Sequence, residues 1–301
     1  MPASGDIANL TVQVDIGNLR YYTSSITGLR HAWKNPSELE ERAVFVQRTF
    51  DSFGLAIQSQ VVPFHGRTYR NIIGTLQGKK DTDLLLVGAH YDAALGSPGA
   101  DDNASGVAVF LEAARILSSA KLDRTLEFVA FTLEEPQLPV MTLSFLIGSR
   151  YFAGEAGKKG VKYKGVLILE SVGYTSERPQ SQSLPPLARI TAPDTGNFLA
   201  VIANRRSKGL LESFCGSATK CVPELPVVGY KVPFSGRLIP ETRFSDHAPF
   251  WDQGYPALML TDTAMFRNPN YHTPYDRLET LDFTFMSRVA KAVVAACCNP
   301  A

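Results

Sequence analysis

The sequence predicts an α/β fold: a single globular domain with a mostly parallel central β-sheet flanked by helices on both faces. Three observations support this prediction. Continuous apolar runs, such as Asp83–Ala89 and Leu126–Leu133, are typical of strands that are buried on both faces. Segments with helical periodicity, such as Ala104–Leu117, alternate with these runs. The 301 residues, 45% of them hydrophobic, can bury a large core without any internal repeat, so one domain over residues 1–301 is expected.

The remaining elements are expected in a regular order along the chain. Residues 1–55 are predicted to be helical, with one helix over Asn9–Ser25 and a second over Ser37–Phe53. Pro36 and several glutamates mark the start of the second helix. The other predicted strands are Ile57–Pro63, Asn71–Leu76, Val166–Leu169 and Ala257–Thr261, and the other predicted helices are Gly148–Ala156, Asn197–Arg206 and Thr280–Cys297.

The composition gives no reason to expect nucleic acid or a membrane as a partner. Thirty basic and 29 acidic residues leave a formal net charge of +1, and no basic run occurs. The longest apolar stretches are too short to span a bilayer, and residues 1–10 do not resemble a secretory signal. We expect a chain that is either cytoplasmic or secreted with its signal removed. The sequence predicts neither the compartment nor the oligomeric state.

The four cysteines do not form a CxxC pair, so cysteine-based zinc binding is not expected. Cys215 and Cys221 are close in sequence and leave two alternatives open. A disulfide between them would indicate an oxidising compartment, whereas two reduced thiols would carry no such meaning.

Polar side chains follow several predicted strands, at the point where each strand ends. His90 and Asp92 follow Ala89, the pair Glu134 and Glu135 follows Leu133, and Glu170 follows Leu169. His272 lies in a loop after the strand Ala257–Thr261. Ligands of parallel sheets bind beyond the carboxyl ends of the strands, so these side chains are expected to meet at one edge of the sheet.

Asp101, just before the predicted helix Ala104–Leu117, adds a further carboxylate to this group. Two histidines and three carboxylates chosen from these residues suit two zinc ions that share one bridging carboxylate. This predicted ligand set is His90, Asp101, Glu135, Glu170 and His272. Asp92 could orient the imidazole of His90, and Glu134 could accept a proton from water. The simpler alternatives are that one of the residues 101–103 caps the following helix and that the glutamate pair lies in solvent beside basic residues.

Seven runs, in order, carry a resemblance to a known family. They are GAHYD, PGADDNASGVA, TLEEP, GSRYFA, LESVGY, SDHAPF and YHTPYDRLETLD, and they span residues 88–282. This set resembles the co-catalytic dizinc aminopeptidases, such as bacterial leucyl aminopeptidases, which are related to zinc carboxypeptidases and glutaminyl cyclases. The resemblance implies the zinc-exopeptidase fold, which is phosphorylase/hydrolase-like, and a peptide substrate.

The resemblance also implies a role for each matching residue. His90 and Glu170 would bind one zinc, Glu135 and His272 would bind the other, and Asp101 would bridge them. The catalytic residues would then be Glu134 as general base, Asp92 as the carboxylate that orients His90, and Tyr271 as a hydrogen-bond donor to the oxyanion. The family commonly has Asp where this chain has Glu170, which is one methylene longer.

The substrate pocket is less closely defined by the sequence. Residues 136–147 form an apolar insert that follows the general base directly, and we expect it to line or cover the pocket, with a surface excursion as the alternative. The candidate substrate-binding residues are Met141, Phe145, Tyr174, Phe244, Arg243 and Arg267. The apolar ones favour an apolar side chain in the substrate. The two arginines could bind a substrate carboxylate or could simply pair with surface acids.

These inferences predict a metal-dependent exopeptidase that is most simply an aminopeptidase. It would release apolar N-terminal residues by attack of water held by two zinc ions, with Glu134 as the general base. A zinc carboxypeptidase or dipeptidase is one alternative. A glutaminyl cyclase is another, although that branch uses one zinc and commonly has tryptophan where this chain has Tyr271. A non-catalytic binding domain would lack a ligand or the base, and none is missing.

Overall fold

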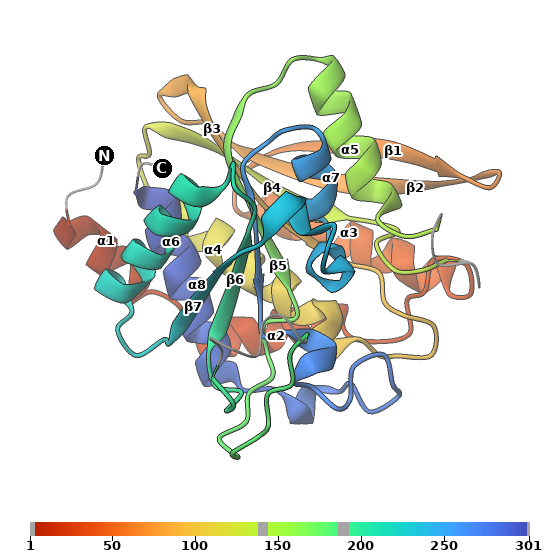
Figure 1. The fold of residues 1–301 in the computed structure, drawn as a ribbon. Helices are drawn as coiled ribbons and strands as arrows, with labels where there is room; N and C mark the ends of the chain where they lie inside the picture. Colours follow the sequence, from red (N-terminus) through yellow and green to blue (C-terminus); the bar gives the residue numbers. More distant parts are fainter. Residues whose placement is uncertain (1–3, 138–143, 186–192, 300–301) are drawn as a thin grey trace.

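A computed structural model describes residues 4–137, 144–185 and 193–299. Its centre is an eight-stranded sheet with the strand order β1-β2-β4-β3-β5-β8-β6-β7 (Figure 1). The strands are β1 (Ala56–Phe64), β2 (Arg67–Leu76), β3 (Lys80–His90), β4 (Arg124–Phe131), β5 (Tyr163–Glu170), β6 (Leu199–Ala203), β7 (Val227–Lys231) and β8 (Ala257–Thr261). The four central strands β4, β3, β5 and β8 are parallel, and they are flanked by β2, which is antiparallel to β4, and by β6, which is antiparallel to β8.

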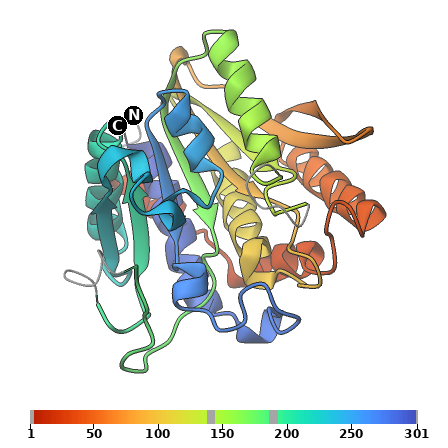
Figure 2. The same ribbon diagram turned by 45° about the vertical axis from the view of Figure 1, so that its right-hand side comes forward.

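Helices cover both faces of the sheet, so the predicted fold class is confirmed (Figure 2). One face carries α1 (Ser4–Thr11), α2 (Ile16–Ile26), α3 (Pro36–Ser52), α4 (Gly106–Ser118), α6 (Lys208–Cys221) and α8 (Phe283–Cys298). The other face carries α5 (Ile147–Lys158) and α7 (His247–Asp252). The part of the chain that the structure describes contains no helix long and apolar enough to cross a membrane.

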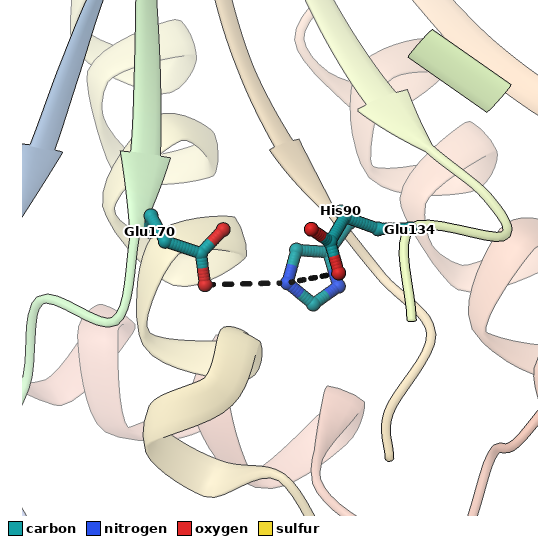
Figure 3. A group of neighbouring side chains, drawn as sticks. All are labelled: His90, Glu134 and Glu170. Carbon is teal, nitrogen blue, oxygen red and sulfur yellow. Dashed lines mark ion pairs between the residues drawn. The ribbon is translucent and has the colours of Figure 1, made fainter. Parts of the chain in front are cut away.

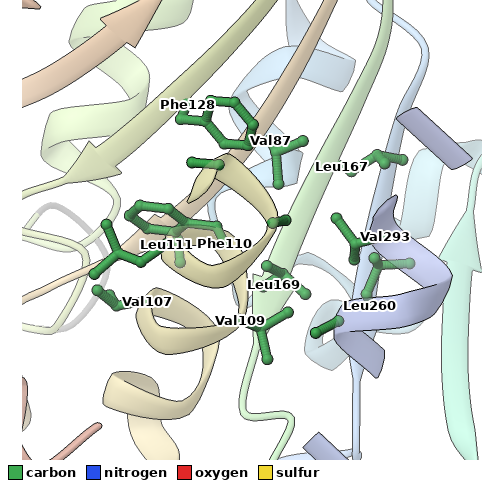
Figure 4. Packing of buried hydrophobic residues seen from close by; sticks show 14 of the residues in the cluster. Val87, Val107, Val109, Phe110, Leu111, Phe128, Leu167, Leu169, Leu260 and Val293 are labelled. Atoms are coloured by element: carbon green, nitrogen blue, oxygen red, sulfur yellow. The ribbon is translucent and has the colours of Figure 1, made fainter. Parts of the chain in front are cut away.

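The larger hydrophobic core lies between α4, α8 and the sheet. Phe110 of α4 and Val293 of α8 are fully buried against apolar side chains of the central strands, such as Val87 and Leu167 (Figure 4). Strands that are apolar on both faces need such cover on both sides, which explains their continuous apolar sequences. This packing fixes the sheet whose edge carries the polar residues.

Three segments differ from the predicted elements. The expected helix over residues 9–25 is broken into α1 and α2, because Asp15 accepts a hydrogen bond from the backbone N–H of Asn18 and so caps a new helix. The expected helix over residues 197–206 is instead the buried strand β6, whose five apolar residues fit either period. Helix α6 and strand β7 had no counterpart in the prediction.

Helix α6 also settles the geometry of two cysteines. Cys215 and Cys221 are both free and both lie in this helix, six residues apart. Six residues of α-helix rise about 9 Å, which exceeds the Cα separation of roughly 4.4–6.8 Å that a disulfide spans. The disulfide alternative is therefore incompatible with this fold.

Candidate metal centre

The sheet brings the predicted polar residues to one edge. His90 is the last residue of β3 and Glu170 is the last residue of β5, and these two strands are parallel neighbours. Glu134 and Glu135 follow β4, after Leu133 turns the chain with a left-handed φ of 56°. Figure 3 shows His90, Glu134 and Glu170 pointing toward one another across the ends of these strands. The prediction of a polar site beyond the carboxyl ends of the strands is confirmed.

One group of donor atoms surrounds the imidazole of His90. Its Nε2 atom lies 3.5 Å from Oε1 of Glu170 and 3.8 Å from Oε2 of Glu134 (Figure 3). The same atom lies 3.2 Å from Oδ1 of Asp102. All four side chains are buried, and the ligand atoms of His90, Glu134 and Glu170 are close enough to share one ion.

A second group surrounds His272. Its Nε2 atom lies 3.0 Å from Oδ2 of Asp102 and 3.2 Å from Oε2 of Glu135. One oxygen of Asp102 therefore faces His90 and the other faces His272. A carboxylate placed in this way is the natural bridge between two ions.

The prediction that Asp101 is the bridging residue is wrong, because Asp102 occupies that place. The Asp101 carboxylate points the other way and accepts hydrogen bonds from the backbone N–H of Gly173, at 2.9 Å, and from the side chain of Asn268, at 2.7 Å. The turn Ala100–Ser105 orients the two adjacent side chains in different directions. The sequence has two neighbouring aspartates at this point, and nothing in it distinguishes which of them faces both histidines.

Asp276 holds this turn in place and was given no role from the sequence. Its two carboxylate oxygens accept hydrogen bonds from the backbone N–H groups of Asp101, at 2.8 Å, and Asp102, at 3.1 Å. Asn103 continues the network, since its side-chain oxygen accepts from the N–H of Gly106 at the start of α4. Among residues 101–103, Asn103 is therefore the one whose side chain binds the start of the helix.

Asp92 supports both groups of donors. Its Oδ1 atom lies 3.4 Å from Nδ1 of His90, as expected for a carboxylate that orients the ring. The same carboxylate accepts hydrogen bonds from the backbone N–H groups of Glu134 and Glu135, each at 3.1 Å. A further support was not predicted: the Ser245 hydroxyl donates to Oε2 of Glu170 at 2.6 Å.

The buried carboxylates of this site repel one another and favour protonation of the neighbouring histidines. Burial raises the pKa of Glu134 well above its usual value, and repulsion from Glu170 and Glu135 adds to this effect. Burial likewise raises the pKa of Glu135 to about 7. Burial alone would lower the pKa of His272, but the carboxylates of Glu135 and Asp102 outweigh it and raise this pKa to about 11. Without an ion, protons on the histidines must balance the buried carboxylates.

The donor set fits divalent metal ions. Both ring nitrogens of His90 and Oε1 of Glu135 are buried without a hydrogen-bond partner. Ligands about 2.0–2.1 Å from a tetrahedral zinc ion lie roughly 3.3 Å apart, which matches the 3.0–3.8 Å between these donors. No lysine or arginine of the described residues forms an ion pair with the carboxylates of this site. Imidazole and carboxylate ligands together are typical of zinc.

Tyr271 lies directly beside the second group. Its ring stacks on the ring of His272, with the centroids 3.9 Å apart and the planes at 15°. Burial raises the pKa of Tyr271 well above its usual value, and the nearby carboxylates of Asp102 and Glu135 raise it further. The Tyr271 hydroxyl therefore keeps its proton and can donate a hydrogen bond.

A large apolar cavity opens from the metal centre. It has a volume of about 420 Å³, and Glu170 and Tyr271 form part of its wall. Most of the remaining wall is apolar and includes Ala200, Ile202, Val232, Phe244, Met259 and Met265. The cavity can hold a sizeable apolar side chain next to the metal-binding residues.

The other predicted substrate-binding residues are distributed unevenly. Phe145 packs edge-on against Phe244, and both line a second cavity together with Arg243. Tyr174 and Arg267 line neither cavity, because Arg267 is buried and donates to the side chain of Gln182 and the carbonyl of Tyr174. Met141 and residues 138–143 of the apolar insert lie outside the described residues.

Comparisons with known proteins agree with this site. Residues 71–297 match the model of peptidase family M28. The chain is 33% identical over 290 residues to the uncharacterized protein YfbL of Escherichia coli K12, which covers 93% of this chain and 86% of YfbL. It is 29% identical to aminopeptidase YwaD of Bacillus subtilis, over 77% of this chain and 45% of YwaD. It is 28% identical to a probable zinc metalloprotease of Leptosphaeria maculans, over 80% of this chain and 60% of that protein. This chain thus spans less than two thirds of the length of the last two relatives.

Solved structures share the fold at low sequence identity. LapB of Legionella pneumophila has a TM-score of 0.75 and 23% identity, covering 97% of this chain and 74% of LapB. A glutaminyl cyclase of Porphyromonas gingivalis has a TM-score of 0.71 and 19% identity, covering 94% of this chain and 97% of that chain. The family match covers most of the sequence and includes every residue of the metal centre, and the chain therefore belongs to peptidase family M28.

Proposed function

We propose that this peptidase is an aminopeptidase with two zinc ions. His90 and Glu170 would hold one ion, His272 and Glu135 would hold the other, and Asp102 would bridge them. The observation that carries this proposal is the position of Asp102, whose two oxygens lie 3.2 Å and 3.0 Å from the two histidines. Zinc is supported by the donor types and by the name of the Leptosphaeria relative.

Zinc, when bound, polarises the scissile carbonyl and lowers the pKa of water near it. The Glu134 carboxylate takes the proton from the attacking water and delivers it to the leaving amine. Two backbone contacts hold Glu134 in place, since its N–H donates to Asp92 and its carbonyl accepts from Leu146. The Tyr271 hydroxyl donates a hydrogen bond to the oxygen that becomes negative.

The substrate would enter with its N-terminal residue at the metal centre. Its positively charged α-amine is attracted by the surrounding carboxylates, and its side chain fits the apolar cavity of about 420 Å³. This arrangement favours large apolar N-terminal residues. The names of the aminopeptidase relatives point in the same direction.

A glutaminyl cyclase is the second candidate, because a cyclase shares the fold over 94% of this chain. Against it stand the two complete groups of donors around His90 and His272. A carboxypeptidase has less support, because Arg243 already pairs with Asp252 at 2.8 Å and Arg267 has partners within the fold.

The first test measures hydrolysis of amino-acid p-nitroanilides and N-blocked dipeptides, with and without a chelator. We expect chelator-sensitive release from free-amine substrates, led by apolar residues, and its loss in Glu134→Gln. Release only from N-blocked peptides would contradict the aminopeptidase. Cyclisation of peptides that begin with glutamine, without any hydrolysis, would favour the cyclase.

The metal assignment has its own test in two adjacent variants. The wild-type protein should bind two zinc ions per chain, measured by elemental analysis after dialysis. Asp102→Asn should lose at least one, whereas Asp101→Asn should keep both, because the Asp101 carboxylate faces away from the histidines. The reverse pattern would assign the bridge to Asp101.

A further inference from the structure

A second cavity lies beside the metal centre and has a different character from the first. It has a volume of about 280 Å³ and lies between the start of α5, the helix α7 and the short helix Pro240–Arg243. Phe244 lines both cavities. Phe145 packs against the ring of Phe244, with the centroids 6.2 Å apart, and so forms an apolar wall of the second cavity.

Positive charge dominates this second cavity. Three arginines line it, Arg150, Arg237 and Arg243, but only one carboxylate does, that of Asp252. Asp252 is taken up by Arg243, whose Nη2 atom donates to both of its oxygens at 2.9 and 2.8 Å. Among the described residues, neither Arg150 nor Arg237 has an ion-pair partner, and Arg150 lies over the ring of Phe145 at 5.1 Å. The cavity thus offers two unpaired guanidinium groups beside apolar walls, which suits a carboxylate on a partly apolar molecule.

The backbone places this cavity on the side of the general base. Leu146 lines the cavity, and its N–H donates to the carbonyl of Glu134 at 2.8 Å. The large apolar cavity, by contrast, is lined by Glu170 and Tyr271 and does not include Glu134. Since Glu134 delivers a proton to the leaving amine, the part of the substrate beyond the scissile bond lies on the side of Glu134.

We propose that the second cavity binds a carboxylate of the leaving peptide through Arg150 and Arg237. This inference rests on the proposed aminopeptidase function and names its substrate class: short peptides with a free C-terminal carboxylate, or an acidic side chain, a few residues after the scissile bond. Such peptides gain an interaction that neutral leaving groups lack. The apolar walls formed by Phe145 and Phe244 would hold the stem of the leaving residue.

The test compares three substrates that share an N-terminal leucine: a tripeptide acid, the matching tripeptide amide and leucine p-nitroanilide. The variants are Arg150→Gln, Arg237→Gln and the double variant. Arg48→Gln is the matched control, because Arg48 is exposed on α3, across the sheet from this cavity. We expect the double variant to raise KM for the acid about tenfold, the effect of losing roughly 1.4 kcal/mol of a charge-assisted contact. Its kcat, and both constants for the amide and the p-nitroanilide, should stay unchanged.

Equal KM values for acid and amide in the wild-type protein would overturn the inference, as would a parallel loss on all three substrates in the double variant. In either case cleavage of the p-nitroanilide would leave the proposed function intact. Calorimetric binding of alanyl-alanine and of its amide to zinc-loaded Glu134→Gln, with and without the double arginine substitution, gives a readout that needs no catalysis. Arginine-dependent preference for the acid, when the wild-type protein cleaves none of the three substrates, would retain the carboxylate site and reject the aminopeptidase.

Discussion

The side chain of Arg30 connects the N-terminal segment to the metal centre by hydrogen bonds to backbone carbonyls. Its side chain is fully buried and donates to the carbonyls of Tyr91, Gly28, Pro98 and Gly99. Tyr91 lies between His90 and Asp92, and Gly99 begins the turn that carries Asp102, so one guanidinium fixes two of the segments that hold the donors. Burial lowers the pKa of Arg30 to about 10, against the opposing effect of nearby carboxylates, and the group is charged at neutral pH.

Replacing Arg30 by methionine should both destabilise the protein and weaken zinc binding. Hydrogen bonds to a charged donor contribute roughly 1.5–3 kcal/mol each, and the substitution leaves four buried carbonyls without this donor. Part of this loss is offset, because methionine does not carry the desolvation penalty of a buried guanidinium. We therefore expect a net loss of about 3–5 kcal/mol, the usual range for breaking a buried charge contact. Zinc affinity should fall at least about tenfold, as for other supports of metal ligands.

The assay uses the metal-free protein, because zinc binding would add its own stabilisation. Urea unfolding gives the change in the free energy of unfolding, and titration of the folded apo-protein with zinc gives the affinity. Arg30→Lys keeps the charge but not the planar array of donors, and it should fall between the wild type and Arg30→Met. A change below about 1 kcal/mol, together with unchanged zinc affinity, would refute the assigned role.

Three further outcomes follow from single contacts. Ser245→Ala should weaken zinc binding about tenfold in the same titration, because Glu170 loses its hydroxyl donor, and should lower the free energy of unfolding of the metal-free protein by about 1–3 kcal/mol. Gly148→Ala should destabilise the protein by about 1–3 kcal/mol in urea, since a Cβ there would lie 2.1 Å from the carbonyl oxygen of Thr132. Burial lowers the pKa of His247 to about 3. The unfolded chain, with a pKa near 6.5, therefore binds the extra proton, and stability should fall as pH drops from about 6.5 toward 3. Between pH 7 and pH 5 the loss should be about 2 kcal/mol larger than in His247→Gln, and equal losses would contradict this reasoning.

The sheet was predictable because its central strands are apolar on both faces and short in sequence. Residues 83–89 and 126–133 allow few other structures, and the polar residues after them mark one edge. The segment Leu199–Ala203 shows the limit of this approach. Its five apolar residues fit a buried helix as well as a strand, and only pairing with β8 and β7 makes them a strand. The local sequence does not show which strands a segment will pair with.

The same distinction applies to the site: some of its residues are placed by the local sequence, and others by contacts with residues far away in the chain. His90 and Glu170 end strands, so their positions follow from the strands themselves. The choice between Asp101 and Asp102 depends instead on Asp276, whose carboxylate binds both backbone N–H groups from about 175 residues away in the chain. No property of the run from 98 to 108 contains that contact. An adjacent pair of like residues in an irregular turn is therefore where sequence reasoning about a metal site is weakest.

The supports of the site also overlap, which bears on how substitutions will combine. Asp92 faces the ring of His90 and binds the backbone of Glu134 and Glu135, so it touches a proposed ligand of each ion and the proposed base. Removing it would disturb three functions at once, although it lies in neither cavity. Its effect and that of Arg30, which binds the Tyr91 carbonyl next to it, should then be smaller together than the sum of the two alone. Both substitutions would displace the same segment, His90–Asp92, so the second adds little to a displacement that the first has already caused.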